Sequence, residues 1–317
     1  MLSKTLPKSS TIVDRKNLSR VILGTHVFGS KPDDFCFKIM DLFTAAGGNI
    51  FDTAAAYGNG SSESCIGRWL KNKNRENFVI CSKCGNPEFK DGLYFRHRLT
   101  RKDMTEDLEN SFKNLQTDYI DIYFVHKDDP SVPVAEIIDF LNEYTAKGAI
   151  RHLGASNWTL QRIGEANAYA EKKGLKGFEF SELAFSLKEN STEGWGENER
   201  VLEMNKTEFT GYMQNQMPVF GYNSQAYGYF YKNFNLPENE MEGSVTNRAA
   251  VTRLKEICTK TGLDMRTALF ATYFGSGLNT FPVVSASTVE HFVELLESFG
   301  AVLDRKDAEY VLGERFY

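Results

Sequence analysis

Short apolar runs alternate with longer amphipathic stretches along almost the whole chain, and this alternation limits the possible folds more than any other feature. Eight runs have the length and composition of buried strands, at residues 21–23, 49–51, 77–82, 119–125, 149–155, 178–183, 217–222 and 280–285. The stretches between them have helical periodicity, for example residues 33–48, 100–115, 134–148 and 159–174. Strands that alternate with helices in this way predict a parallel sheet.

Eight strand–helix units in 317 residues predict a closed (β/α)8 TIM barrel, with residues 1–317 as a single α/β domain. An open, doubly wound sheet is the alternative. A dinucleotide-binding sheet of that kind carries G-x-G-x-x-G after its first strand, and V-I-L-G-T-H-V-F-G at residues 21–29 lacks this pattern. The least regular segment, residues 188–198, is expected to form a loop over one end of the barrel.

Composition and charge argue against several classes of protein. A net charge of −5 and a pI of about 5.7 do not fit a broad nucleic-acid interface. No apolar run approaches the ~18 residues of a membrane span, and the polar start M-L-S-K-T-L-P-K-S-S has no apolar signal region. Five cysteines without framework spacing fit a reducing cytosol. We therefore expect a cytoplasmic protein with a small-molecule substrate and no nucleic-acid or membrane partner; its oligomeric state is open.

The C-x-x-C motif at Cys81 and Cys84 has the spacing of a redox pair or of half a zinc site. No second such motif or paired-histidine element completes a zinc site, and residues three apart on a strand point to opposite faces. The five histidines show no paired spacing either. We therefore expect neither a functional thiol pair nor a metal site, which argues against a metal-dependent hydrolase.

Polar residues follow the predicted strands at the end where barrel enzymes hold their active sites. Asp52 and Tyr57 follow the second strand, and Lys83 and His126 end the third and fourth. An ammonium lowers the pKa of a neighbouring phenol, a carboxylate holds that ammonium, and an imidazole can orient a carbonyl oxygen. Each residue alone is more often structural. Together at one barrel mouth they predict proton delivery to an oxygen that becomes negative as hydride arrives, which is carbonyl reduction or its reverse.

Four motifs resemble those of the aldo-keto reductase family. G-G-N-I-F-D-T-A-A-A-Y-G-N-G-S-S-E, residues 47–63, resembles the family signature around its aspartate and tyrosine, and N-F-V-I-C-S-K, residues 77–83, resembles its lysine strand. L-E-N-S-F-K-N-L-Q-T-D-Y-I-D-I-Y-F-V-H, residues 108–126, resembles its histidine strand. K-G-A-I-R-H-L-G-A-S-N-W, residues 147–158, resembles its fifth strand. The resemblance runs from about residue 21 to residue 299. It implies a barrel enzyme that reduces an aldehyde or ketone with NAD(P)H, or catalyses the reverse.

The resemblance also implies a role for each matching residue. Tyr57 would donate the proton, with Lys83 and Asp52 as its tuning pair, and His126 would orient the carbonyl. The cofactor would be NADP, with NAD as the alternative. The expected cofactor-binding residues are Gly24, Thr25, Asp52, Ser156, Asn157, Glu182, Tyr222, Asn223, Ser224, Gln225, Ala226, Ser285, Ala286, Ser287, Thr288 and His291. The expected substrate-binding residues are His26, Phe28, Tyr57, His126 and Trp158, and further candidates for the pocket wall are Phe89, Tyr94, Trp195 and residues 96–98.

Several positions depart from the family pattern. Glu182 stands where the family usually has glutamine, and a carboxylate can accept from a nicotinamide carboxamide but cannot donate to it. Ser285 and His291 stand where many members have the lysine and arginine that bind the 2′-phosphate of NADP. Without fixed cations a phosphate dianion is bound less strongly, so the choice between NADP and NAD is open.

A different function is also possible. Some barrels of this family act as regulators, so the alternative is a cofactor-binding regulatory subunit with little turnover. Aromatic residues beside polar groups suit a sugar-derived carbonyl, a polyol or an aryl carbonyl, and we expect a polyol or sugar-derived carbonyl as the substrate.

Overall fold

The computed structural model describes residues 5–91, 93–189 and 201–317. Within these residues, eight parallel strands close into a barrel in the order β10–β11–β12–β3–β4–β5–β8–β9. Their bounds are β3 Ile22–Gly24, β4 Ile50–Asp52, β5 Val79–Cys84, β8 Ile120–Val125, β9 Ile150–Ser156, β10 Phe180–Ala184, β11 Val219–Tyr222 and β12 Thr280–Val284. The closed barrel predicted from the alternation is confirmed, and the open sheet is excluded.

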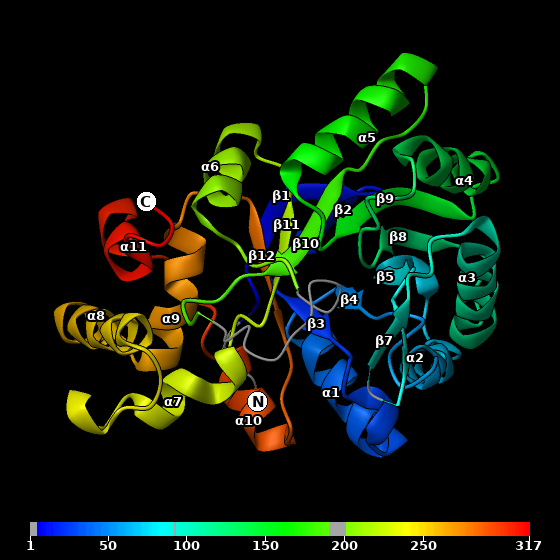
Figure 1. Cartoon of the computed structure of the whole chain (residues 1–317). Coiled ribbons are helices and arrows are strands. Elements are labelled where there is room, and N and C mark those ends of the chain that lie inside the picture. Colours follow the sequence, from blue (N-terminus) through cyan, green and yellow to red (C-terminus); the bar gives the residue numbers. More distant parts are fainter. Residues whose placement is uncertain (1–4, 92, 190–200) are drawn as a thin grey trace.

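Helices surround the strands as an outer ring (Figure 1). Their bounds are α1 Asp33–Ala45, α2 Ser61–Leu70, α3 Arg101–Leu115, α4 Val134–Ala146, α5 Leu160–Lys173, α6 Lys206–Asn215, α7 Tyr229–Asn233, α8 Val245–Thr261, α9 Met265–Gly275, α10 Val289–Leu296 and α11 Arg305–Leu312. In this ring α1 lies beside α10, and the last helix, α11, packs against α8 and α9. Polar caps fix several helix starts. Thr100 accepts a hydrogen bond from the Asp103 amide at the start of α3.

Two antiparallel hairpins lie outside the alternating pattern. One consists of β1 Lys8–Val13 and β2 Lys16–Ser19, and the other of β6 Glu88–Lys90 and β7 Leu93–Arg96. Val13 and Leu18 of the first hairpin are fully buried in one cluster with Ile22 and Ile50, the first residues of β3 and β4. The hairpin therefore closes the amino-terminal end of the barrel and leaves the carboxyl end for a site.

The region after β10 differs from the prediction. The sequence predicts a helix at about residues 198–213. In the structure, α6 begins at Lys206, because the Asn205 side chain accepts a hydrogen bond from the Glu208 amide and caps the first turn. Most of the loop expected at residues 188–198 lies outside the described residues.

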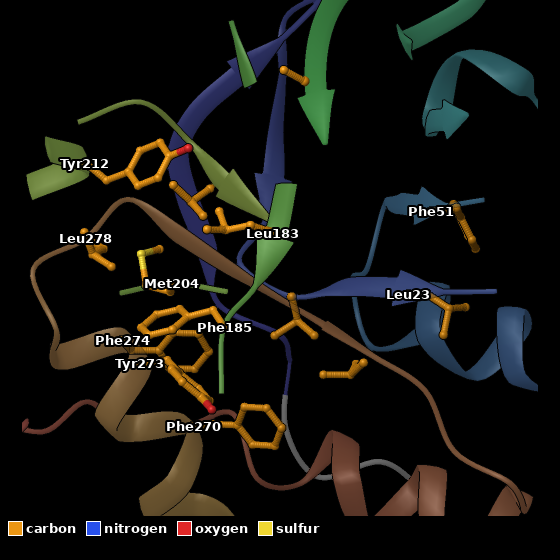
Figure 2. Close-up of a cluster of buried hydrophobic side chains, with 14 of the residues drawn as sticks. Leu23, Phe51, Leu183, Phe185, Met204, Tyr212, Phe270, Tyr273, Phe274 and Leu278 are labelled. Atoms are coloured by element: carbon orange, nitrogen blue, oxygen red, sulfur yellow. The ribbon is translucent and has the colours of Figure 1, made fainter. Parts of the chain in front are cut away.

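Two hydrophobic cores hold the barrel together. The inner core fills the barrel with rings from different strands, and Phe220 lies between Phe124 and Phe281 at centroid distances of 5.5 and 5.7 Å. The outer core lies between the strands and the helices, and Figure 2 shows one part of it. There Phe185, just after β10, meets the ring of Tyr273 from α9 edge-on at 5.0 Å. Burial on both faces explains why the strands read as continuous apolar runs.

Gly67 lets α2 approach the carboxyl end of α3 closely. A Cβ atom at residue 67 would lie 2.3 Å from the backbone oxygen of Asn114 and 2.9 Å from the carbonyl carbon of Leu115. Because these atoms belong to the backbone, a larger side chain can be accommodated only if one helix shifts.

We predict that Gly67→Ala lowers the free energy of unfolding by about 1–3 kcal/mol, the usual cost of overpacking. The control is Gly164→Ala within α5, where a Cβ atom meets nothing within 4 Å. That change should stabilise the helix by roughly 0.5–1 kcal/mol, because alanine is the better helix former. Urea denaturation of both variants measures the two effects. A Gly67 variant as stable as the Gly164 variant would contradict the close approach.

Candidate active site

The carboxyl ends of the barrel strands surround a cavity of about 1010 Å³. Asp52 ends β4, Ser156 ends β9 and Tyr222 ends β11, and all three line this cavity. Because the strands are parallel, side chains at these positions converge on one mouth although they are far apart in the sequence. The cavity thus lies at the end of the barrel that the sequence predicted.

Lys83 lies at the centre of the site, fully buried near the end of β5. Its Nζ atom donates to Asp52 Oδ1 at 2.5 Å, to the Thr53 carbonyl oxygen at 3.0 Å and to the Tyr57 hydroxyl at 3.3 Å. Glu182 Oε1 of β10 lies 3.4 Å from the same nitrogen. A buried ammonium persists only with such compensation, because transfer of an unpaired charge from water is very unfavourable.

The charges of this group shift one another's pKa values. Burial opposes the charge of Lys83, but Asp52 and Glu182 outweigh burial and raise its pKa well above the usual value. Burial raises the pKa of Asp52 although Lys83 acts in the opposite direction. Burial, and next the charge of Asp52, raise the pKa of Glu182 to about 8. Lys83 is therefore a permanent ammonium between two carboxyl groups.

Tyr57 and His126 face one another beside Lys83. The Tyr57 ring lies edge-on between His126 and His26, with centroid distances of 5.7 and 5.0 Å. Burial raises the pKa of Tyr57 more than the Lys83 ammonium lowers it. The Lys83 ammonium lowers the phenol pKa, as the sequence suggests, but burial has the larger effect, so the phenol keeps its proton. Burial, and next Lys83, lower the pKa of His126 well below its usual value, so its imidazole is neutral.

Asn157 connects three of the strand ends. Its Nδ2 atom donates to the His126 carbonyl oxygen and to Ser156 Oγ, each at 3.1 Å. Its Oδ1 atom accepts from the Tyr222 hydroxyl at 2.6 Å and from the Leu202 amide at 3.1 Å. These four bonds use the full capacity of an amide side chain. Asn157 therefore lines the cavity as the residue that orients Tyr222, rather than with a free amide for a ligand.

Most predicted site residues line the cavity. They are Gly24, His26, Asp52, Tyr57, His126, Ser156, Asn157, Glu182, Tyr222, Asn223, Ser224, Gln225, Ala226, Ser285, Ala286, Ser287 and His291, together with the wall candidate Phe89. Trp195, another wall candidate, lies outside the described residues.

The cavity wall does not include five predicted site residues, Thr25, Phe28, Lys83, Trp158 and Thr288, nor the wall candidates Tyr94 and residues 96–98. Thr25 is fully buried and its hydroxyl donates to the Asp52 carbonyl oxygen at 2.8 Å. Phe28 is buried in the outer core, and Trp158 is buried against Phe178 at 5.2 Å. Thr288 caps α10 through the His291 amide. The side chains of Thr25, Phe28, Trp158 and Thr288 therefore point into the protein or cap a helix. The direction of a side chain cannot be read from its position next to a sequence motif.

Sequence reasoning missed four cations on the cavity wall, Lys31, Lys127, Lys188 and Arg266. Arg266 lies in the first turn of α9, and its guanidinium lies 3.2 Å from Glu294 Oε2. The Asp264 cap marks the start of this helix, but nothing in the sequence shows which side of the helix faces the cavity.

Among the described residues, no group of three or more His, Cys, Asp or Glu residues could hold a metal ion. Cys81 and Cys84 are both buried, one in the inner core and the other in the outer core. None of the described helices is both long and apolar enough to cross a membrane.

A closed parallel barrel with ionisable residues around a cavity at its carboxyl end has the architecture of barrel enzymes. The model of the aldo/keto reductase family matches residues 20–312, so the chain belongs to this family. Its members are NAD(P)-dependent oxidoreductases, and the protein is such an enzyme.

Named relatives agree with this membership. The aldo-keto reductase ausK of Emericella nidulans is 25% identical over 301 residues, which cover 89% of this chain and 73% of that protein. Norsolorinic acid reductase B of Dothistroma septosporum is 35% identical over 157 residues, 48% of this chain and 40% of that protein. The structure of a glycerol dehydrogenase from Gluconobacter oxydans superimposes with a TM-score of 0.74 at 20% identity, covering 98% of this chain and 94% of that one. At that identity the likeness shows the fold.

Lys83→Met should be strongly destabilising, because it leaves Asp52 and Glu182 buried without their cation. Loss of one partner of a buried ion pair typically costs about 3–5 kcal/mol, and we expect a decrease of this size in the free energy of unfolding at pH 9. The loss should be smaller at pH 5, where the raised pKa values let the orphaned carboxyls take up protons. The control is Arg101→Met, which breaks an exposed pair with Glu143 and should change stability little. Equal losses in both variants would contradict the account.

Proposed function

We propose that this enzyme reduces an aldehyde or ketone to the alcohol, or catalyses the reverse, with Tyr57 as the proton donor. The observation that carries this proposal is the contact of the Tyr57 hydroxyl with the buried Lys83 ammonium at 3.3 Å, on the wall of the cavity. A phenol that keeps its proton until the substrate oxygen becomes negative is suited to this task.

The cavity fits a nicotinamide cofactor. Its volume is at the upper end of the ~300–1,000 Å³ usual for ligand sites. Tyr222 presents an aromatic ring whose hydroxyl is fixed by Asn157, and Ser156 offers a hydroxyl for the carboxamide. Residues 223–226 and 285–287 line the same cavity, and the Ser285 amide donates to Gln225 Oε1 at 3.1 Å. These two segments follow the seventh and eighth barrel strands, where barrels often bind phosphate.

The bound cofactor supplies the hydride. Residues of the chain orient the carbonyl oxygen and donate a proton to it. His126 is neutral and can donate a hydrogen bond to the carbonyl oxygen without releasing a proton. Tyr57 transfers its proton to the oxygen as negative charge develops there. The resulting phenolate is stabilised by the Lys83 ammonium, which Asp52 holds in place.

We propose that the cofactor is NADP, and that the enzyme binds it only modestly more tightly than NAD. His291 and Arg266 line the same cavity as Ser285 and Ser287 and are the candidate partners of an adenosine phosphate. Glu294 already neutralises part of the Arg266 charge. A phosphate dianion therefore gains less here than beside unpaired cations.

The substrate pocket mixes an aromatic surface with polar groups. His26 packs against the Tyr57 ring. Asn86 and Phe89 line the same cavity, and Lys31 and Lys127 add positive charge. Such a wall suits a small polyhydroxylated carbonyl with several hydrogen-bonding groups.

Tyr57→Phe should reduce carbonyl reduction by about 10²–10⁴-fold, the usual contribution of a positioned general acid. Activity is measured over a panel of aldehydes, ketones and sugars with NADPH and NADH. Binding of both cofactors, followed by quenching of tryptophan fluorescence, should be unchanged, and NADPH should bind only modestly more tightly than NADH.

The matched control is Tyr169→Phe, because this hydroxyl bonds Asp139 on the outside of the barrel. It should leave both activity and cofactor binding unchanged. Normal turnover by the Tyr57 variant would exclude the proton-donor role. A wild-type protein that binds cofactor tightly and reduces no carbonyl in the panel would instead support a regulatory subunit.

A further inference from the structure

Two carboxyl groups share one ammonium at the base of the cavity. Lys83 Nζ lies 2.5 Å from Asp52 Oδ1 and 3.4 Å from Glu182 Oε1, and all three side chains are at most 4% exposed. Burial, and next the charge of Asp52, raise the pKa of Glu182. Two carboxylates beside one ammonium repel each other, so one of them keeps a proton to a higher pH than an isolated carboxyl would.

Glu182 faces the cavity with one oxygen unused. Its Oε2 atom is buried and has no hydrogen-bond partner among the described residues. Glu182 lines the cavity and pairs in register with Ser156 of β9, and the next strand, β11, carries Tyr222. The proposed function assigns these two neighbours to the nicotinamide, so Glu182 faces the same ring from the strand between them.

We propose that Asp52 and Glu182 share one proton around Lys83, and that loss of this proton makes the site favour the oxidised cofactor over the reduced one. This inference rests on the proposed function, which places the nicotinamide in this cavity. The proton on Glu182 leaves Asp52 and Lys83 as a neutral ion pair. Without it, two carboxylates face one ammonium, and the site has a net charge of one negative unit.

Among the described residues, few other groups can contribute a change of charge near Glu182. The titratable groups that face Glu182 or its partner Asp52 lie at the ends of five barrel strands. They are His26 after β3, Asp52 at the end of β4 and Tyr57 after it, Cys81 and Lys83 of β5, His126 after β8, and Tyr222 of β11. Burial raises the pKa of the Cys81 thiol and of both phenols, so these groups stay neutral. Lys83 stays charged and His126 stays neutral. The pKa of Glu182 is raised to about 8, so the carboxyl pair titrates between pH 7.5 and 9.5.

The sign of the effect follows from the charge of the ligand. The oxidised nicotinamide ring is a cation and the reduced ring is neutral, so a negative site attracts only the oxidised form. A unit charge acting over a few ångströms at an effective dielectric near 20 is worth on the order of a tenfold change in affinity or more. As pH rises through about 8, binding of the oxidised form relative to the reduced form should therefore become tighter. Higher pH already favours alcohol oxidation, because that reaction releases a proton. Tighter binding of the oxidised cofactor would favour it further.

The test measures Kd for NADP⁺ and for NADPH at several pH values from 7.5 to 9.5 by quenching of tryptophan fluorescence. The ratio of the two constants cancels the titration of phosphate groups, which both forms carry. In the wild type, Kd of NADPH divided by Kd of NADP⁺ should rise by roughly tenfold across this range. In Glu182→Gln, which keeps the shape but cannot ionise, the ratio should stay at the wild-type value of pH 7.5.

The control is Glu208→Gln, because Glu208 is also a buried glutamate with a pKa raised by burial but lies in α6 away from the cavity. This variant should keep the rise seen in the wild type. A ratio that is flat with pH in the wild type, or that still rises in Glu182→Gln, overturns the inference. If Glu182→Gln does not fold, the wild-type profile alone decides. These failures leave cofactor binding and carbonyl reduction intact, whereas failure of the proposed function would appear as loss of binding or as a fully active Tyr57→Phe.

Discussion

The buried ammonium of Lys83 is the group on which the rest of the site depends. It lies inside a closed barrel, where a charge is stable only with partners at hydrogen-bonding distance. Asp52, Glu182 and Tyr57 supply those partners from the second strand, the sixth strand and the loop after the second strand. The Lys83 ammonium thus has two roles. It binds side chains from several strand ends, and it can stabilise the phenolate of Tyr57.

The barrel itself makes this grouping possible. Parallel strands place every carboxyl end on one side, and the β1–β2 hairpin closes the other side with Val13 and Leu18. The remaining opening is a cavity whose wall combines ionisable groups with Tyr222 and the segments after β11 and β12. The side-chain amide of Asn157 uses all four of its hydrogen bonds to connect three of these strand ends. This part of the cavity wall is therefore ordered before a ligand binds.

The alternation of strands and helices was enough to predict the closed barrel, because each strand is buried on both faces and reads as an apolar run. The hairpins were not predictable in the same way. Asp14 and Arg15 form the turn between β1 and β2 with positive φ angles of 46° and 67°, without the Asn-Gly or Gly signal that such turns usually carry. Strand-end positions located Asp52, Lys83 and His126, but they could not show that burial outweighs Lys83 at Tyr57. Nor could they show that Glu182 reaches Lys83 across the barrel, since β10 and β5 are not neighbours in the sheet.

The central claim is that hydride moves from a nicotinamide in this cavity to a carbonyl carbon held beside Tyr57. The most direct measurement uses NADPH deuterated at C4 on one face or the other, with mass spectrometry of the alcohol product. A cofactor held in one orientation between Tyr222 and the carbonyl should transfer deuterium from one face only, with one deuterium per product molecule. Alcohol that carries no deuterium from either face, or equal amounts from both, would contradict the account.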